Sequence, residues 1–289
     1  MHWWRLLATL VTCVLLVVVT AVPAAARDRG QVDAVYLALG DSVAFGFSPL
    51  VDPRNAANFV GYPEALAERL DLNLTNASCP GEASGGFISL TGIDNVCRPY
   101  RASFPLHAAY STAQLEFAVA FLRAHQHTRL VTLDIGANDL FVLEKQCLGA
   151  ATCIQNGLPA LLNMLAANLS TIYRGLRGQA HYKHELVALT YYVSNFKDPA
   201  AVAVIQAINA TVVAATAAAD GKTADGFGAF QAAAGPAGDS CTAGLLIKTP
   251  AGPTPCDVHP SPRGRDVLAG AIRATLHHAE EDGDLRDPD

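Results

Sequence analysis

Short apolar runs alternate with stretches of helical periodicity along most of the chain. Apolar runs over residues 35–39, 130–135 and 185–191 are typical of buried strands, and a weaker run over 71–76 indicates a fourth strand. Apolar side chains recur every three or four positions in five segments, which predicts helices over residues 62–70, 112–125, 158–176, 200–219 and 265–278. This alternation predicts an α/β fold, with a parallel sheet covered by helices on both faces.

The first 26 residues have the layout of an export signal. An apolar run over residues 6–22 is followed by three alanines before Arg27. Small residues there are typical of a cleavage site, so we expect residues 1–26 to be a signal peptide that is removed on secretion from a bacterial cell. A retained membrane anchor is the alternative, because the run is nearly long enough to span a bilayer. Residues 27–289 then form one domain, whose acidic tail we expect to fray from about residue 280.

The composition excludes several classes of protein. Hydrophobic residues make up 51% of the 289 residues and charged residues only 16%, which is too apolar for a disordered chain. The formal net charge of −6 gives no electrostatic reason to bind nucleic acid or an anionic surface. No P-loop or GxGxxG motif follows a predicted strand, which disfavours a nucleotide-binding module. No heptad or strong edge-strand signal is present, so we expect a monomer.

Cysteine usage agrees with export. Six cysteines remain after the predicted cleavage, and an even number in an exported chain is typical of disulfides: Cys79, Cys97, Cys147, Cys153, Cys241 and Cys256. Six cysteines allow many pairings, and we favour the nearest-neighbour set, 79–97, 147–153 and 241–256, because it closes three local loops. The last pair would hold a Gly- and Pro-rich loop over residues 235–255. Neither CxxC pairs nor Cys/His clusters occur, so the sequence predicts no zinc site.

Polar residues that could carry chemistry follow the predicted strands. Ser42 comes directly after the strand predicted over residues 35–39, in Gly40-Asp41-Ser42, and Asn138 follows the strand predicted over residues 130–135 in the same way. Ligands of parallel sheets gather at the carboxyl ends of the strands, where a serine can present its hydroxyl and an asparagine can donate to an oxyanion. Each feature alone is also typical of an ordinary turn or helix cap.

Two further residues complete a set for acyl transfer. Gly81 follows the weak strand, and a glycine there can offer its backbone N–H to a ligand, although a loop glycine beside a disulfide is the plainer interpretation. His259 lies just before the last predicted helix rather than on a helical face, which favours it as the general base. A nucleophile, two oxyanion donors and a base indicate a hydrolase that works through an acyl-enzyme.

Four short blocks resemble those of the SGNH (GDSL) hydrolase family, in the order in which that family has them. They are ALGDSVAFGF with Ser42, NASCPGEASG with Gly81, DIGANDL with Asn138 and CDVHPSPRG with His259. The resemblance implies a flavodoxin-like three-layer α/β/α fold and a secreted esterase or lipase that needs neither metal nor cofactor. It implies that Ser42 is the nucleophile and His259 the base. The oxyanion hole would consist of the N–H groups of Ser42 and Gly81 and the side chain of Asn138. Similar secreted members carry three local disulfides.

The chain departs from the family pattern at the acid that orients the histidine. The usual acid lies three residues before the histidine, and that position is Cys256 here. Asp257 lies only two residues before His259, so in an extended segment it would point differently from the usual acid. Either Asp257 reaches His259 or a main-chain carbonyl orients the ring, and Asp257 is the candidate for the third catalytic residue.

Several neighbouring residues have a structural interpretation. We expect Asp41 and Asp139 to fix their turns by accepting backbone N–H bonds. Asp134 lies inside an apolar strand and would need a partner if buried, and the sequence names none. Three aromatic residues could line an acyl pocket, although ordinary packing is the plainer interpretation: Phe45, Tyr191 and Tyr192.

Two other functions stay open from the sequence. The first is a carbohydrate acetylesterase of the same fold, which is disfavoured because Trp3 and Trp4, the only tryptophans, fall in the signal segment and cannot stack on a sugar. The second is an exported binding protein without catalysis. Loss of Ser42, Asn138 or His259 would favour it, and all three are present. The expected partner is therefore a small-molecule or lipid ester.

Overall fold

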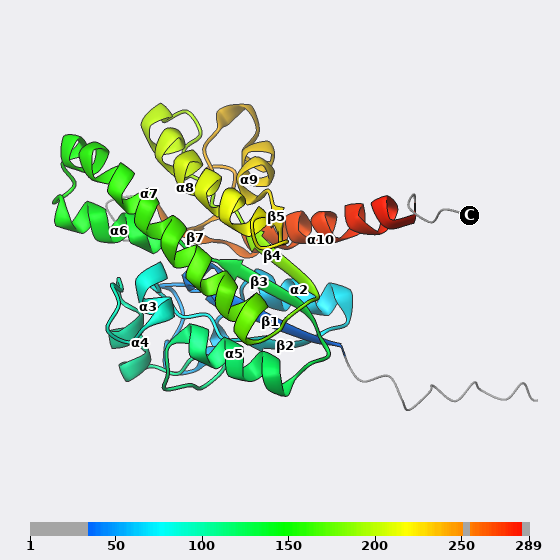
Figure 1. Cartoon of the computed structure of the whole chain (residues 1–289). Coiled ribbons are helices and arrows are strands. Elements are labelled where there is room, and N and C mark those ends of the chain that lie inside the picture. Colours follow the sequence, from blue (N-terminus) through cyan, green and yellow to red (C-terminus); the bar gives the residue numbers. More distant parts are fainter. Residues whose placement is uncertain (1–33, 251–254, 285–289) are drawn as a thin grey trace, which may run out of the picture. The chain divides into compact units, whose positions relative to one another are not determined.

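The chain is built around a sheet of five parallel strands (Figure 1). The computed structural model describes residues 34–250 and 255–284. The strands are β1 (Val35–Gly40), β2 (Asn73–Asn76), β3 (Thr128–Asp134), β4 (Glu185–Leu189) and β5 (Lys222–Ala224). Their spatial order is β2-β1-β3-β4-β5, so β3 is central and β1 lies beside it.

The central strands are apolar along nearly their whole length because both faces of the sheet are covered. Every residue of β1 after Val35 is buried, and in β3 every residue except Arg129 is buried. Continuous apolar strands of this kind are typical of parallel sheets with helices on both faces. The register pairs Gly40 with Asp134, which brings the carboxyl ends of β1 and β3 together.

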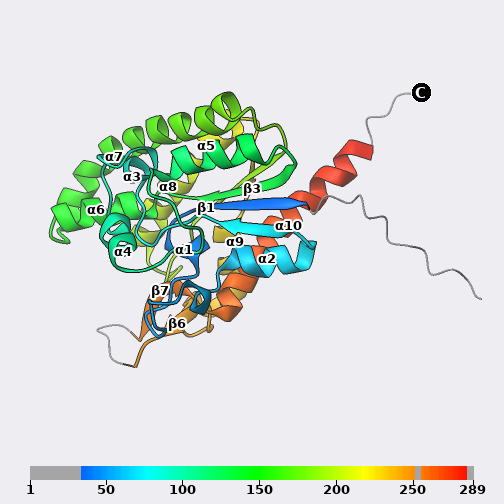
Figure 2. The same ribbon diagram turned by 90° about the horizontal axis from the view of Figure 1, so that it is seen from below.

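Helices cover the two faces of the sheet. Figure 2 shows α5 and α7 on one face and α2 and α10 on the other. The helices of the first half are α1 (Ser42–Phe45), α2 (Tyr62–Leu70), α3 (Ser84–Ile88), α4 (Cys97–Ser103) and α5 (Gln114–Ala124). Those of the second half are α6 (Ala137–Gln146), α7 (Ala151–Tyr173), α8 (Pro199–Ala217), α9 (Gly226–Ala234) and α10 (Pro262–Asp284). The predicted three-layer α/β/α fold is confirmed.

A two-stranded antiparallel hairpin lies outside the main sheet (Figure 2). It pairs β6 (Leu246–Lys248) with β7 (Cys256–Pro260). The sequence predicts a loop over residues 235–255, and this is wrong for β6. A strand of three residues in a Gly- and Pro-rich stretch shows no alternation of apolar and polar positions, so the sequence carries no signal for it. The hairpin matters for function because His259 lies on β7.

Five α-helices of the described residues were not predicted, namely α1, α3, α4, α6 and α9, and α7 begins earlier than predicted. The sequence did not predict α6, because Gly136-Ala137-Asn138-Asp139 is typical of a turn, and the helix begins within these residues. The helix that the periodicity predicts over residues 158–176 corresponds to α7, but the start at residue 158 is wrong. The helix instead begins at Ala151 and keeps Pro159 in its interior, where that residue is exposed.

The ends of the chain lie largely outside the described residues. This holds for the predicted signal peptide, residues 1–26, and for residues 285–289 of the acidic tail. Where the tail is described, α10 continues to Asp284, beyond the end that the sequence predicted at residue 278.

Three disulfides join Cys79 to Cys97, Cys147 to Cys153 and Cys241 to Cys256. The nearest-neighbour pairing is therefore confirmed. The first ties the loop after β2 to α4, the second closes the turn between α6 and α7, and the third anchors β7.

One helix of the described chain, α8, is long and apolar enough to cross a membrane by length and composition alone. A core helix of a soluble protein passes the same test, and 22% of the tested window is buried here. The helix packs against α7 and against β4 and β5 of the main sheet.

Candidate active site

Ser42 lies where the chain leaves the centre of the sheet. β1 ends at Gly40, and α1 begins at Ser42. Asp41 caps this short helix because its Oδ1 accepts the N–H of Val43 at 2.9 Å, which confirms its predicted structural role. Gly40 has a φ of +135°, and a Cβ there would lie 2.3 Å from the main-chain oxygen of Asp134. Only glycine fits this turn, which places Ser42 at the carboxyl end of β1.

Two carboxyl groups are buried next to Ser42. Asp41 and Asp134 are each 1% exposed, and the N–H of Asp41 donates to the main-chain oxygen of Asp134 at 3.2 Å. Burial raises the pKa of both groups, and the charge of Asp41 raises the pKa of Asp134 further. The pair therefore holds a proton at a pH at which exposed carboxyl groups have lost theirs. The hydroxyl of Tyr62 donates to Oδ1 of Asp134 at 2.8 Å and supplies a partner that the sequence did not reveal.

Asn138 is the second residue of α6 and follows the carboxyl end of β3. Its Nδ2 donates to Oδ2 of Asp41 at 3.0 Å, and its Oδ1 accepts from Nδ2 of Asn95 at 2.8 Å. The hydroxyl of Tyr191 donates to the same Oδ2 of Asp41 at 2.6 Å. These bonds fix which end of the Asn138 amide faces Asp41. Because an amide nitrogen carries two hydrogens, one remains for a ligand after the bond to Asp41.

Asp139 connects two helices. Its carboxylate accepts the N–H of Ser84 at 3.0 Å and the hydroxyl of Ser84 at 2.6 Å. The sequence predicts that Asp139 fixes the turn after β3, whereas its hydrogen bonds to Ser84 tie α6 to the start of α3.

Gly81 lies in the loop after β2, where only glycine fits. Its φ is +80°, and a Cβ there would lie 2.0 Å from Cγ2 of Val96. Its carbonyl accepts the N–H groups of Asn95 and Val96, each at 3.2 Å, and the Cys79–Cys97 disulfide closes the same loop. The loop is therefore held next to β1, but Gly81 is not among the residues that line the cavity described below. Its role as an oxyanion donor stays a prediction.

His259 lies on β7, next to Asp257. Nδ1 of His259 contacts Oδ1 of Asp257 within hydrogen-bonding distance, and the N–H of His259 donates to the same oxygen at 3.0 Å. Residues two apart on a strand share a face, which explains how Asp257 reaches the ring. Burial acts to raise the pKa of Asp257, but its hydrogen bonds with His259 and the charge of His259 outweigh burial and hold the pKa below the ordinary value. Of the two arrangements that the sequence left open, the structure has the side chain at the ring nitrogen.

Three contacts hold the segment that carries His259. The imidazole packs against the ring of Phe47, with 4.8 Å between the ring centroids. The hydroxyl of Tyr192 donates to the main-chain oxygen of Val258 at 2.8 Å. The disulfide between Cys241 and Cys256 anchors the first residue of β7.

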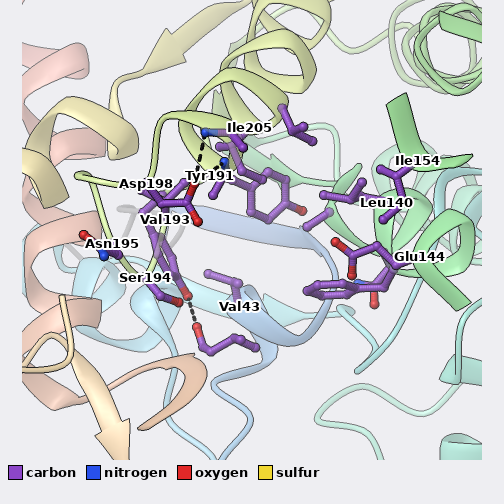
Figure 3. Close-up of a pocket in the computed structure, with 18 of the residues that line it drawn as sticks. Val43, Leu140, Glu144, Ile154, Tyr191, Val193, Ser194, Asn195, Asp198 and Ile205 are labelled. Carbon is purple, nitrogen blue, oxygen red and sulfur yellow. Dashed lines mark hydrogen bonds between the residues drawn. The ribbon is translucent and has the colours of Figure 1, made fainter. Parts of the chain in front are cut away.

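Ser42, Asn138 and His259 line one cavity of about 440 Å³, although they come from α1, α6 and β7. Most of the remaining wall is apolar and comes from α6, α7 and α8, as Figure 3 shows for Leu140, Ile154 and Ile205. Tyr191 and Tyr192 line the cavity as well.

Phe45 does not line this cavity but packs against other aromatic rings. Its ring centroid lies 4.9 Å from that of Phe59 and 4.6 Å from that of His107. The plainer interpretation, ordinary packing, therefore holds for Phe45, and the pocket interpretation fits the two tyrosines.

Among the described residues, one group has side chains of the types that bind a metal ion: Cys79, Glu82 and Cys97. The two cysteines are joined in a disulfide and offer no thiolate. This group is therefore a structural cluster rather than a metal site.

Comparison with known proteins agrees with this geometry. Residues 38–267 match the model of the GDSL-like lipase/acylhydrolase family. A search of curated proteins found no match. The chain belongs to the GDSL-like lipase/acylhydrolase family, and it is therefore a carboxylic ester hydrolase.

Solved structures of low sequence identity share the fold. Phospholipase A1 from Streptomyces albidoflavus NA297 is 17% identical, with a TM-score of 0.55 over 84% of this chain and 99% of that chain. An extracellular lipase from Streptomyces rimosus is 16% identical, with a TM-score of 0.53 over 84% and 99%. The acetylxylan esterase Axe2 from Geobacillus stearothermophilus is also 16% identical, with a TM-score of 0.52 over 84% and 94%.

Proposed function

We propose that the protein is a secreted serine esterase of the lipase type, in which Ser42 attacks the carbonyl carbon of a carboxylic ester. The observation that carries this proposal is that Ser42, Asn138 and His259 line one cavity although they lie on separate segments of the chain. A nucleophile, a donor for the oxyanion and a base within one cavity are what acyl transfer requires.

His259 acts as the base in the first step. Its Nε2 takes the proton from the hydroxyl of Ser42 while the serine oxygen bonds to the carbonyl carbon. Asp257 holds the hydrogen on Nδ1 and stabilises the imidazolium that forms. The alcohol then leaves with the proton from His259, and the acyl group stays on Ser42. A water molecule, deprotonated by His259, releases the carboxylic acid and restores the serine.

The negative charge of the intermediate is stabilised by three donors: the N–H groups of Ser42 and Gly81 and the Nδ2 group of Asn138. Asn138 is suited to this role because Asp41 and Asn95 hold its amide in one orientation before substrate arrives. Donors that are already oriented cost no reorganisation when charge develops, which is why they lower the barrier effectively.

The wall of the cavity favours an acyl chain longer than acetyl. Its volume of about 440 Å³ lies within the range of roughly 300–1,000 Å³ that is usual for small-molecule sites. Each buried methylene group contributes about 0.8 kcal/mol to binding. Apolar side chains such as Leu140, Ile154 and Ile205 can therefore bind a chain that an acetyl ester lacks.

Secretion forms part of the proposal. Three disulfides join all six cysteines between residues 79 and 256, and disulfides persist in oxidising compartments. The extracellular lipase of Streptomyces rimosus has the same fold. Both observations support the signal peptide that residues 1–26 predict.

Hydrolysis of p-nitrophenyl esters from acetyl to palmitoyl tests the proposal. We expect turnover by the protein from residue 27 onward, with an optimum beyond acetyl, and loss of turnover in Ser42→Ala. Ser111→Ala removes an exposed hydroxyl as a matched control and should keep full activity. An optimum at acetyl would favour the carbohydrate acetylesterase. Absence of Ser42-dependent turnover, with the protein folded, would favour a binding protein.

A further inference from the structure

The cavity next to Ser42 carries negative charge without matching positive charge. Three acidic residues line it: the buried Asp41 beside Ser42, and Glu144 and Asp198, which lie on opposite sides of the cavity (Figure 3). The described residues that line it include no Lys or Arg. An anionic ester would therefore meet the carboxylates of Glu144 and Asp198, and a cationic ester would be attracted by both.

Both carboxylates are held near the cavity by their own helices. Asp198 caps α8, and its Oδ1 accepts the N–H groups of Ala200 at 3.0 Å and Ala201 at 3.2 Å. Glu144 lies on α6, and burial raises the pKa of its carboxyl group above the ordinary value. A cation bound nearby would offset that cost by favouring the ionised form.

Aromatic rings line the same cavity and add a second attraction for a cation. Phe141 lies three positions before Glu144 on α6, so the two side chains share one side of the helix. The ring of Tyr192 is held by stacking on Phe230, at 4.0 Å between centroids, and by the bond of its hydroxyl to the main-chain oxygen of Val258. Aromatic faces together with carboxylates are what proteins use to bind quaternary ammonium groups.

We propose that this cavity selects esters whose alcohol carries a compact organic cation, such as a quaternary ammonium group, over neutral and anionic esters of the same shape. This inference depends on the proposed function, because it names the substrate class of the Ser42 site. Hydrolysis of such an ester uses one water and releases the cationic alcohol, which takes a proton from His259, and the free acid.

The size of the cavity makes the charge effect independent of the exact pose. A volume of about 440 Å³ corresponds to a sphere about 9 Å across, which is less than the Debye length of about 10 Å at 0.1 M salt. Any charge inside the cavity therefore interacts with both carboxylates. At the high effective dielectric constant of an open site, two attractions of this range raise kcat/KM for a cationic ester about tenfold over that for a neutral ester.

The test compares butyrylcholine with its uncharged carbon analogue, 3,3-dimethylbutyl butyrate, which has the same shape. We expect kcat/KM for the cationic ester to exceed that of the neutral ester about tenfold at low ionic strength. The ratio should fall toward one in the double variant Glu144→Gln, Asp198→Asn. Asparagine caps a helix as well as aspartate does, so α8 keeps its start. Glu116→Gln, on the exposed face of α5, is the matched control and should leave the ratio unchanged.

A ratio near one in the wild-type protein, or a ratio that the double variant does not change, would overturn the charge selectivity. Failure of the proposed function has a different signature, because neither ester would then be hydrolysed in a Ser42-dependent way. In that case, calorimetric binding of the same two esters to Ser42→Ala decides the selectivity. About tenfold tighter binding of butyrylcholine supports it, and equal binding contradicts it.

Discussion

The two sides of the site are built in different ways. Ser42 and Asn138 follow neighbouring central strands, and a buried carboxyl group, Asp41, connects them. His259 lies on a short hairpin outside the main sheet, where the partly exposed Asp257 and a disulfide hold it. We call the first the sheet side of the site and the second the hairpin side.

Stability and activity are coupled on the sheet side more closely than on the hairpin side. On the sheet side, the groups that orient Asn138 are also buried polar groups of the core, so their loss costs folding energy as well as activity. On the hairpin side, the contact that orients His259 is local and partly exposed, so its loss affects activity first.

The largest expected effect is that of Asp257→Asn on the hairpin side. An asparagine would favour the wrong tautomer of His259, and we expect kcat/KM to fall by about 10⁴. The unfolding temperature should change little, because Asp257 is only partly buried. Steady-state hydrolysis of a p-nitrophenyl ester and a thermal melt measure the two effects. Asp239→Asn, which changes the same residue type in the segment before β6, is the control. A loss of less than tenfold in Asp257→Asn would mean that a main-chain carbonyl can orient the ring.

Asn138→Ala should have the next largest effect, on the sheet side. Removal of one oxyanion donor costs about 10²–10³ in kcat. Unlike Asp257→Asn, this variant should also lose about 1–2 kcal/mol of stability, because Asp41 loses a buried hydrogen-bond partner. Kinetics and urea denaturation measure the two quantities. Full activity in Asn138→Ala would remove this residue from the site, and an unchanged stability would contradict the coupling on the sheet side.

The sequence was more informative about the sheet side. Ser42 and Asn138 could be found because each follows a buried apolar run, and the carboxyl ends of parallel strands meet. The hydrogen bonds around Asp41 could not be predicted from the sequence, because its partners Asn138 and Tyr191 lie 97 and 150 positions away in the chain. No local pattern specifies contacts of that range, and the same holds for the bond from Tyr62 to Asp134.

On the hairpin side, the sequence supplied the residues but not their arrangement. His259 and Asp257 are only two positions apart, yet the strand that sets their orientation pairs with a segment of three residues, Leu246–Lys248. A segment of this length has no measurable periodicity. The carboxylates of Glu144 and Asp198 were missed for a related reason, because only the packing of α6 and α8 brings them to the cavity.

Removal of the disulfide at the hairpin gives a third prediction. Cys241 and Cys256 are 15 positions apart, and a loop of about that length corresponds to ~3 kcal/mol of stability in the chain-entropy model. We expect the free energy of unfolding of the Cys241→Ser, Cys256→Ser variant to fall by about this amount. Because β7 loses its anchor, we also expect the variant to lose activity at temperatures at which it is still folded.

The matched control is the Cys147–Cys153 disulfide, which closes a loop with a separation of 6 positions. Its removal should cost less, about 2 kcal/mol. Equal activity of the wild type and the Cys241→Ser, Cys256→Ser variant below its melting transition would show that the disulfide does not help to position His259.

The last prediction concerns a buried acid on the sheet side and the pH dependence of stability rather than activity. Glu82 is 2% exposed, and its carboxylate accepts from Nε2 of Gln114 at 3.2 Å. The side chain of Gln114 in turn bonds the N–H and the carbonyl of Gly40 at 2.6 and 3.0 Å. Burial, with a smaller contribution from the charge of Asp94, raises the pKa of Glu82 to about 8.

Between its ordinary pKa and about pH 8, the folded state therefore holds a proton that the unfolded chain has lost. The free energy of unfolding should fall as the pH rises through this window, by up to about 1.4 kcal/mol per pH unit, and level off above it. Glu82→Gln removes this dependence, so urea denaturation from about pH 5 to pH 8 should give a flatter profile than in the wild type. An identical slope in the variant, with Glu116→Gln as the exposed control, would contradict a protonated Glu82.

In the proposed mechanism, the sheet side and the hairpin side act on one serine, Ser42. The most direct measurement is reaction of the protein with a p-nitrophenyl alkylphosphonate, followed by mass spectrometry of the intact protein and its peptides. We expect one adduct, on Ser42, that forms far more slowly in His259→Ala. An adduct on a different residue, or labelling of Ser42 at the same rate without His259, would contradict it.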